Sequence, residues 1–190
     1  LKEASENPDY DMRKIFDNTL IQSHPQMAVT FVDNHDSQPG EALESFVNPD
    51  FKKIAYALIL LRHDGYPCVF FGDYYGLGDP QPMEPKKDII DNLLYLRKTF
   101  AYGAEENYFE KEHLIGWVRH GEEHHPEKLA VVISTKEEDS LRMFVGKEES
   151  GKVYQDYTGS REEKITIGED GFADFPVNSR DVSCWAVEGK

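Results

Sequence analysis

One short apolar run ends in the group of polar residues best suited to chemistry. Residues 27–32, MAVTFV, are apolar and rich in β-branched side chains, and the polar residues that follow are Asp33, Asn34, His35 and Asp36. Such a run is stable only in a protein interior, whereas the polar group requires a cleft. The pattern predicts a buried strand whose end opens into an active site. In the structural alternative, the carboxylates cap the strand end by accepting backbone N–H bonds.

The elements around this group alternate between helix and strand up to about residue 104. Asn48 suits a helix N-cap, Pro49 suits the first helical position, and Gly65 ends the apolar helical spacing. The predicted order is helix 10–22, strand 27–32, helix 48–65, strand 67–71, and a helix that includes residues 89–96. This alternation predicts parallel strands joined by helical crossovers. Two parallel strands do not form a stable covered sheet, so we expect further strands upstream in a longer parent protein.

From residue 105 the pattern changes to short strands separated by turn residues. The segments are LIGWVR, KLAVVIS, SLRMFVG, KVYQDY, EKITIG, GFADF and DVSCWAV. Their spacing of roughly 8–15 residues is typical of an antiparallel β-sandwich. The chain is therefore predicted to be α/β over residues 1–104 and all-β over residues 105–190.

Composition excludes several classes of partner. The formal net charge of −15 argues against binding to nucleic acid or to anionic membranes, because both would repel the chain. No apolar stretch is long enough to span a bilayer, and the first ten residues lack the character of a signal peptide. Cys68 and Cys184 both lie in apolar runs, which predicts two buried thiols and no disulfide.

The string FVDNHD followed by SQPG resembles the fourth signature region of the α-amylase family, glycoside hydrolase family 13. Residues 41–76 resemble the seventh helix and eighth strand of bacterial liquefying-type and cytoplasmic α-amylases, and residues 7–20 resemble the preceding helix. Residues 101–187 are similar to their C-terminal β-domain. The resemblance implies the last two strands of a TIM (β/α)8 barrel over residues 1–104. It implies a Greek-key β-sandwich over residues 105–190.

The resemblance also implies roles for three residues. Asp36 matches the third catalytic carboxylate, which holds hydroxyl groups of the reacting sugar and stabilises an oxocarbenium-like transition state. A carboxylate beside developing positive charge binds the transition state better than the ground state. His35 matches the histidine that hydrogen-bonds the same sugar, and Gln38 is expected to line the cleft. Asp33 and Asn34 are expected to support them structurally.

The implied reaction is retaining endo-hydrolysis of α-1,4-glucosidic bonds in starch, glycogen or maltodextrins. A retaining glycosidase requires a nucleophile and a general acid about 5 Å apart. In the family these come from two earlier signature regions, and neither is present in this sequence. We therefore expect the isolated chain to be inactive. It would need the missing N-terminal part of the same barrel as a partner, and its substrate would be an α-1,4-glucan.

Calcium is implied for the parent protein, with most of its ligands upstream. A further calcium position of some relatives aligns with Tyr10, Glu112, His113 and Thr135. Histidine and threonine stand there in place of the expected carboxylates, so no metal site is assigned to this chain. The two thiols and the likeness to cytoplasmic amylases favour a cytoplasmic location, with an extracellular parent as the alternative.

Two other functions remain open at this point. The β-domain alone would suit a non-catalytic glucan-binding or interaction module. Two His-Asp dipeptides, at residues 35–36 and 63–64, together with His24 allow a metal-dependent phosphohydrolase. Such phosphohydrolase sites are typically built on helical bundles, whereas here the first dipeptide ends a strand.

Overall fold

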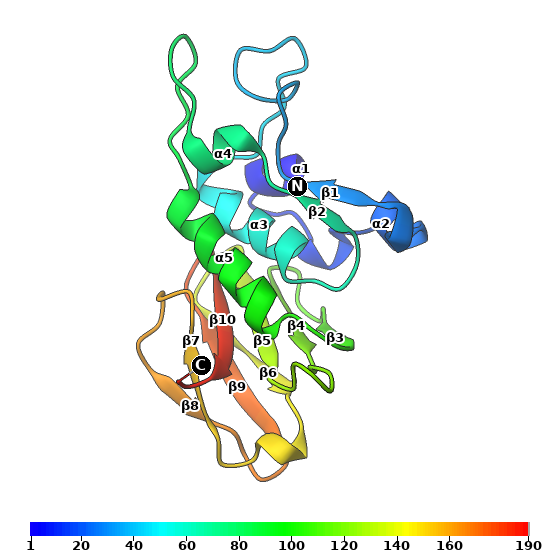
Figure 1. Cartoon of the computed structure of the whole chain (residues 1–190), viewed down its shortest axis with the longest axis vertical. Helices are drawn as coiled ribbons and strands as arrows, with labels where there is room; N and C mark the ends of the chain where they lie inside the picture. Colours follow the sequence, from blue (N-terminus) through cyan, green and yellow to red (C-terminus); the bar gives the residue numbers. More distant parts are fainter. Residues whose placement is uncertain (190) are drawn as a thin grey trace.

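The computed structural model describes residues 1–189, with a helical part above an antiparallel β part (Figure 1). In the upper part, β1 (Val29–Phe31) pairs in parallel with β2 (Tyr66–Cys68). The crossover between them contains a 3-10 turn, η3 (Pro49–Phe51), and helix α3 (Lys52–Leu60). The Asn48 side chain accepts the Asp50 N–H and so caps this helical segment. The predicted parallel pair and its helical crossover are confirmed.

The prediction that both strands are buried is wrong for this chain. Val29 is 60% exposed and Tyr66 is 76% exposed, and Phe31 is exposed as well. Within the described residues β1 and β2 form a two-stranded sheet, so no further strand covers these side chains. Cys68 is exposed for the same reason, which corrects its prediction as a buried thiol, whereas Cys184 is buried as predicted.

Several helices differ from their predicted bounds. The predicted helix 10–22 is broken by Asn18, which has a positive φ of 58°. The chain there forms short elements, namely α1 (Lys2–Glu6), η1 (Met12–Lys14), α2 (Leu20–Ser23) and η2 (Pro25–Met27). The second strand ends at Cys68, and Phe71, predicted to lie in that strand, begins helix α4 (Phe71–Tyr75). Helix α5 (Lys87–Phe100) contains the predicted segment 89–96. None of the helices within residues 1–189 is long and apolar enough to cross a membrane.

The lower part is the predicted antiparallel β-sandwich. Its larger sheet contains, in spatial order, β3 (Glu105–Tyr108), β4 (Leu114–Arg119), β5 (Leu129–Ser134), β10 (Asp181–Val187), β7 (Val153–Asp156) and β8 (Lys164–Thr166). β6 (Asp139–Phe144) pairs with β9 (Phe172–Val177), with the turn η4 (Lys147–Glu149) after β6. All seven predicted strands occur. Strand β3 was not predicted, because its sequence EENY lacks an apolar run.

Two cores hold the molecule together. One lies inside the sandwich, between the larger sheet and the β6–β9 pair. The other joins the two parts, because α3 and α5 cover the outer face of the larger sheet (Figure 1). There the buried Trp117 of β4 donates its indole N–H to the Leu61 carbonyl oxygen at 3.3 Å. The hydrophobic core is thus continuous across residue 104.

Candidate active site

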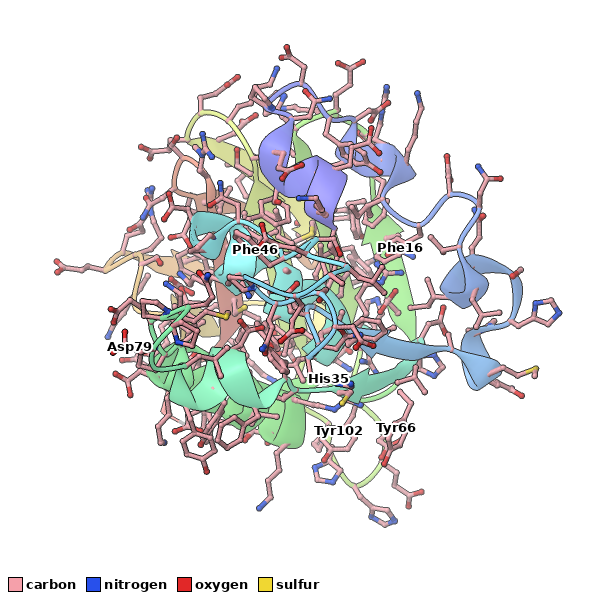
Figure 2. The ribbon with its side chains drawn as sticks, turned by 90° about the horizontal axis from the view of Figure 1, so that it is seen from above. Phe16, His35, Phe46, Tyr66, Asp79 and Tyr102 are labelled. Carbon is pink, nitrogen blue, oxygen red and sulfur yellow. The ribbon has the colours of Figure 1, made fainter. Side chains whose placement is uncertain are left out.

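Two loops project from the end of the molecule opposite the sandwich (Figure 1). One runs from residue 34 to 46 after β1, and the other from residue 76 to 86 after α4. Figure 2 looks down on this end and labels His35 and Phe46 in the first loop and Asp79 in the second. Since β1 and β2 are parallel, the segments that follow both strands begin at the same edge of the sheet. The polar group predicted from the sequence lies at this edge.

The Asp33 carboxylate is buried and closes the first loop. It accepts the backbone N–H of Val47 at 3.0 Å, which brings the two ends of the loop together. It also accepts a hydrogen bond from the Lys52 ammonium of α3. Burial raises the pKa of Asp33, and the bond to Lys52 opposes that rise. Asp33 therefore has the structural role predicted as the alternative, in which a carboxylate at the strand end accepts a backbone N–H.

The Lys52 ammonium also binds a second buried carboxylate. That carboxylate is Asp73 of α4, which in turn accepts the Tyr56 hydroxyl hydrogen bond at 2.7 Å. Burial and the adjacent Asp73 raise the pKa of Tyr56, so its hydroxyl remains a donor. Lys52 was not predicted as a site residue from the sequence. The available signal was a lysine four residues before Tyr56, in a helix whose other residues are almost all apolar.

Asn34 shapes the turn that presents His35 and Asp36. Its side-chain oxygen accepts the backbone N–H groups of Asp36 at 3.0 Å and of Ser37 at 2.9 Å. The Ser37 hydroxyl oxygen accepts the Asn34 N–H at 3.0 Å. These local bonds form an Asx turn, which fixes the backbone without using the two residues expected to contact substrate.

His35 and Asp36 both face solvent. Their side chains are 83% and 62% exposed, and the His35 Nε2 atom lies 3.4 Å from the Asp36 Oδ1 atom. Within residues 1–189 the Asp36 carboxylate accepts no backbone N–H, and its nearest side-chain partner is the exposed His35. Gln38 is half-buried, and its side-chain amide donates to Glu41 at 3.3 Å. The structure thus brings His35 and Asp36 together, and it places Gln38 within the same loop.

This arrangement is suited to binding hydroxyl groups and to stabilising positive charge. Retaining hydrolysis requires a second carboxyl group about 5 Å away, across the scissile bond. Asp33 does not suit that role, because it is buried and engaged by Lys52 and Val47. The described residues therefore offer one exposed carboxylate at this site, and Asp33 does not provide a second.

No group of three or more His, Cys, Asp or Glu residues in the described part of the chain is arranged to hold a metal ion. Near the position aligned with a calcium site, the Arg13 guanidinium lies between Asp11 at 2.9 Å and Glu112 at 3.2 Å. His113 lies 3.3 Å from Glu137, and its carbonyl oxygen accepts the Thr135 N–H. The Asp11 and Glu112 carboxylates at this position are thus both paired with the Arg13 guanidinium.

Comparison with known proteins gives several relatives, although no family model matches the sequence. The chain is 48% identical over 178 residues to an α-amylase of Geobacillus stearothermophilus, covering 93% of this chain and 32% of that protein. It is 43% identical over 185 residues to an α-amylase of Bacillus licheniformis, covering 96% and 36%. It is 39% identical over 189 residues to a cytoplasmic α-amylase of Escherichia coli (strain K12), covering 95% and 38%. The chain spans about a third of the length of these relatives.

Solved structures agree on the fold. A gamma-CGTase from alkalophilic Bacillus clarkii aligns with a TM-score of 0.66 at 23% identity, over 100% of this chain and 31% of that chain. A cyclomaltodextrin glucanotransferase with a three-domain ABC distribution aligns with a TM-score of 0.67 at 22% identity, over 99% and 43%. Sequence and fold together identify the chain as a homologue of the C-terminal part of the α-amylases of glycoside hydrolase family 13.

Proposed function

We propose that this chain supplies the transition-state-stabilising side of an α-amylase. The reaction is retaining endo-hydrolysis of α-1,4-glucosidic bonds in starch, glycogen or maltodextrins. Asp36 holds hydroxyl groups of the reacting sugar and stabilises the oxocarbenium-like transition state, His35 hydrogen-bonds the same sugar, and Gln38 lines the cleft. One observation carries this proposal. The Asp36 carboxylate is free of backbone bonds and faces solvent, while Asp33 takes the structural role.

The amylase proposal has more support than the alternatives from the sequence. Relatives at 39–48% identity carry the names α-amylase and glucan 1,4-α-maltohexaosidase, and each match covers at least 93% of this chain. The His-Asp phosphohydrolase has no comparable support. The strongly acidic chain is compatible with a neutral glucan as substrate.

The proposal divides the chain into barrel residues 1–104 and a β-domain over residues 105–190. The exposed side chains of β1 and β2 support further barrel strands beside them, because apolar strand faces are normally covered. The missing part of the barrel would supply the nucleophile, the general acid and most ligands for calcium. We therefore expect the chain by itself to be inactive. Two free thiols and the similarity to a cytoplasmic α-amylase favour a cytoplasmic location.

A chimera tests this function. The region of the Bacillus licheniformis α-amylase that matches this chain is replaced by the chain, and activity on soluble starch is measured for the chimera and for the chain alone. The proposal predicts activity from the chimera and none from the chain. Substantial hydrolysis by the chain alone would show that it contains a complete catalytic centre, contrary to the proposal.

The same chimera tests Asp36. Asp36→Asn keeps the size of the side chain and removes its charge, so kcat is expected to fall about 100- to 1,000-fold. Asp64→Asn is a matched control, because Asp64 also follows a histidine and pairs with it at 3.0 Å, but lies beyond the C-terminal end of α3. The control should keep the activity of the parent chimera.

A further inference from the structure

Lys52 is a deeply buried cationic side chain near the candidate active site. Its side chain is 2% exposed, and those of its partners Asp33 and Asp73 are each 1% exposed. A lysine is buried at this depth only where carboxylates compensate the lost hydration of its charge. One ammonium between two carboxylates therefore fixes the relative positions of three elements. These elements are the end of β1, helix α3 and helix α4.

The bond to Asp33 reaches the exposed pair through a short path. Asp33 lies two residues before His35 and three before Asp36, and it also binds the Val47 N–H at the far end of the loop. The Asx turn at Asn34 makes the intervening backbone stiff. Movement of Asp33 would therefore move the pair together with both ends of the loop.

Lys52 also lies beneath both projecting loops. Together with Asp73 it lines a cavity of about 300 Å³. Pro39 and Phe46 of the first loop and Met83 of the second line the same cavity. Lys52 and Asp73 therefore lie beneath both loops, at the edge of the sheet where His35 and Asp36 lie.

We propose that Lys52 is a positioning residue for hydrolysis, which holds the Asp33–Val47 loop so that Asp36 meets the reacting sugar. This inference rests on the proposed function of Asp36. Lys52 itself is too deeply buried to touch substrate. A displacement of about 1 Å in a catalytic group can cost about 100-fold in rate. We therefore expect its removal to lower kcat by about 10- to 100-fold.

The test uses the active chimera with Lys52→Met and a matched control, Lys53→Met. Lys53 is the next residue of α3, and its ammonium pairs with Asp181 at 2.7 Å and with the Ser160 hydroxyl at 2.6 Å, away from the loop. Lys53→Met is expected to lower the melting temperature and to leave kcat per folded molecule unchanged. Lys52→Met is expected to lower both. Equal kcat values for the two variants would overturn the inference.

A triple variant separates positioning from stability. In Lys52→Met with Asp33→Asn and Asp73→Asn no buried charge is left unpaired, so the melting temperature should recover relative to Lys52→Met. If Lys52 acts by positioning, kcat stays low, because the bond that holds Asp33 is still absent. Recovery of kcat together with stability would show a merely structural role.

Asp36→Asn in the same chimera distinguishes the role of Asp36 from that of Lys52. Full activity of Asp36→Asn would refute the proposed function itself. Loss of activity in Asp36→Asn with parental kcat in Lys52→Met would refute only the positioning role.

Discussion

Arg62 connects the helical part to the sandwich, and its removal is expected to destabilise the whole chain. Its guanidinium lies 2.7 Å from the Glu105 carboxylate of β3 and donates to the Asn107 side chain at 2.8 Å. It also lies 4.3 Å from the centre of the Phe16 ring and 5.4 Å from that of Trp117. Both members of the ion pair are more than nine-tenths buried. The pair therefore joins segments that the sequence analysis assigned to different domains.

The magnitude follows from this burial. Arg62→Met leaves the Glu105 carboxylate buried without its cation, which costs about 3–5 kcal/mol. With an m-value of about 2 kcal/mol/M, a loss of about 4 kcal/mol moves the urea midpoint by about 2 M. Arg142→Met is the matched surface control. Arg142 pairs with Asp170 at 2.7 Å and lies over the Phe172 ring, but about half of its side chain is exposed. Its loss should cost less than about 1 kcal/mol.

The assay is urea unfolding of the 190-residue chain, followed by tryptophan fluorescence and circular dichroism. Burial lowers the pKa of Arg62, but from a value so high that the group stays charged, so the effect should be the same from pH 6 to 9. The double variant Arg62→Met with Glu105→Gln removes the unpaired charge and should recover more than half of the loss. The reasoning is refuted if Arg62→Met is no more destabilising than Arg142→Met.

Two further predictions concern the thiols and acid stability. Cys68 should react with a thiol reagent in the native chain, whereas Cys184, whose pKa is raised by burial, should react only after unfolding. Rapid labelling of two thiols in native protein, or of any thiol in Cys68→Ser, would contradict this. Burial raises the pKa of Asp139, but Lys111 at 2.7 Å and the Ser140 N–H outweigh it and hold the pKa below its ordinary value. This stabilisation is present above the unfolded pKa of about 4 and is lost as pH falls further. Asp139→Asn should therefore lower the free energy of unfolding by on the order of 1 kcal/mol at pH 7. In urea titrations from pH 7 to 2, the difference in unfolding free energy between the variant and the parent chain should shrink below pH 4. A constant difference would exclude this role.

Elements with strong local signals were predictable from the sequence. The segment that contains η3 and α3 begins with the cap Asn48 and with Pro49, and it has continuous apolar spacing. The strands β4, β5 and β10 are apolar runs bounded by turns. In these segments local propensity and tertiary burial favour the same secondary structure, so the sequence pattern was sufficient to predict each element. The predicted helix 10–22 failed because Asn18 takes a left-handed conformation inside otherwise helical spacing.

Features that depend on partners distant in sequence were not predictable. The Phe71 position satisfies an apolar strand pattern as well as a helix pattern, and periodicity cannot decide between them over so few residues. Cys68 was predicted to be buried because apolar runs usually are, but burial requires neighbouring strands. The burial of Lys52 depends on its ion pairs with Asp33 and Asp73, which lie 19 and 21 residues away in the sequence. The polar group at residues 33–36 was found because its members are contiguous.

The kinetics of Asp36→Asn in the chimera show whether the Asp36 carboxylate acts in the transition state. Because a group that acts in the transition state affects kcat and kcat/KM together, both should fall by at least about 100-fold, while the melting temperature stays within a few degrees of the parent chimera. A folded Asp36→Asn chimera that hydrolyses starch with the parental kcat would show that Asp36 does not stabilise the transition state.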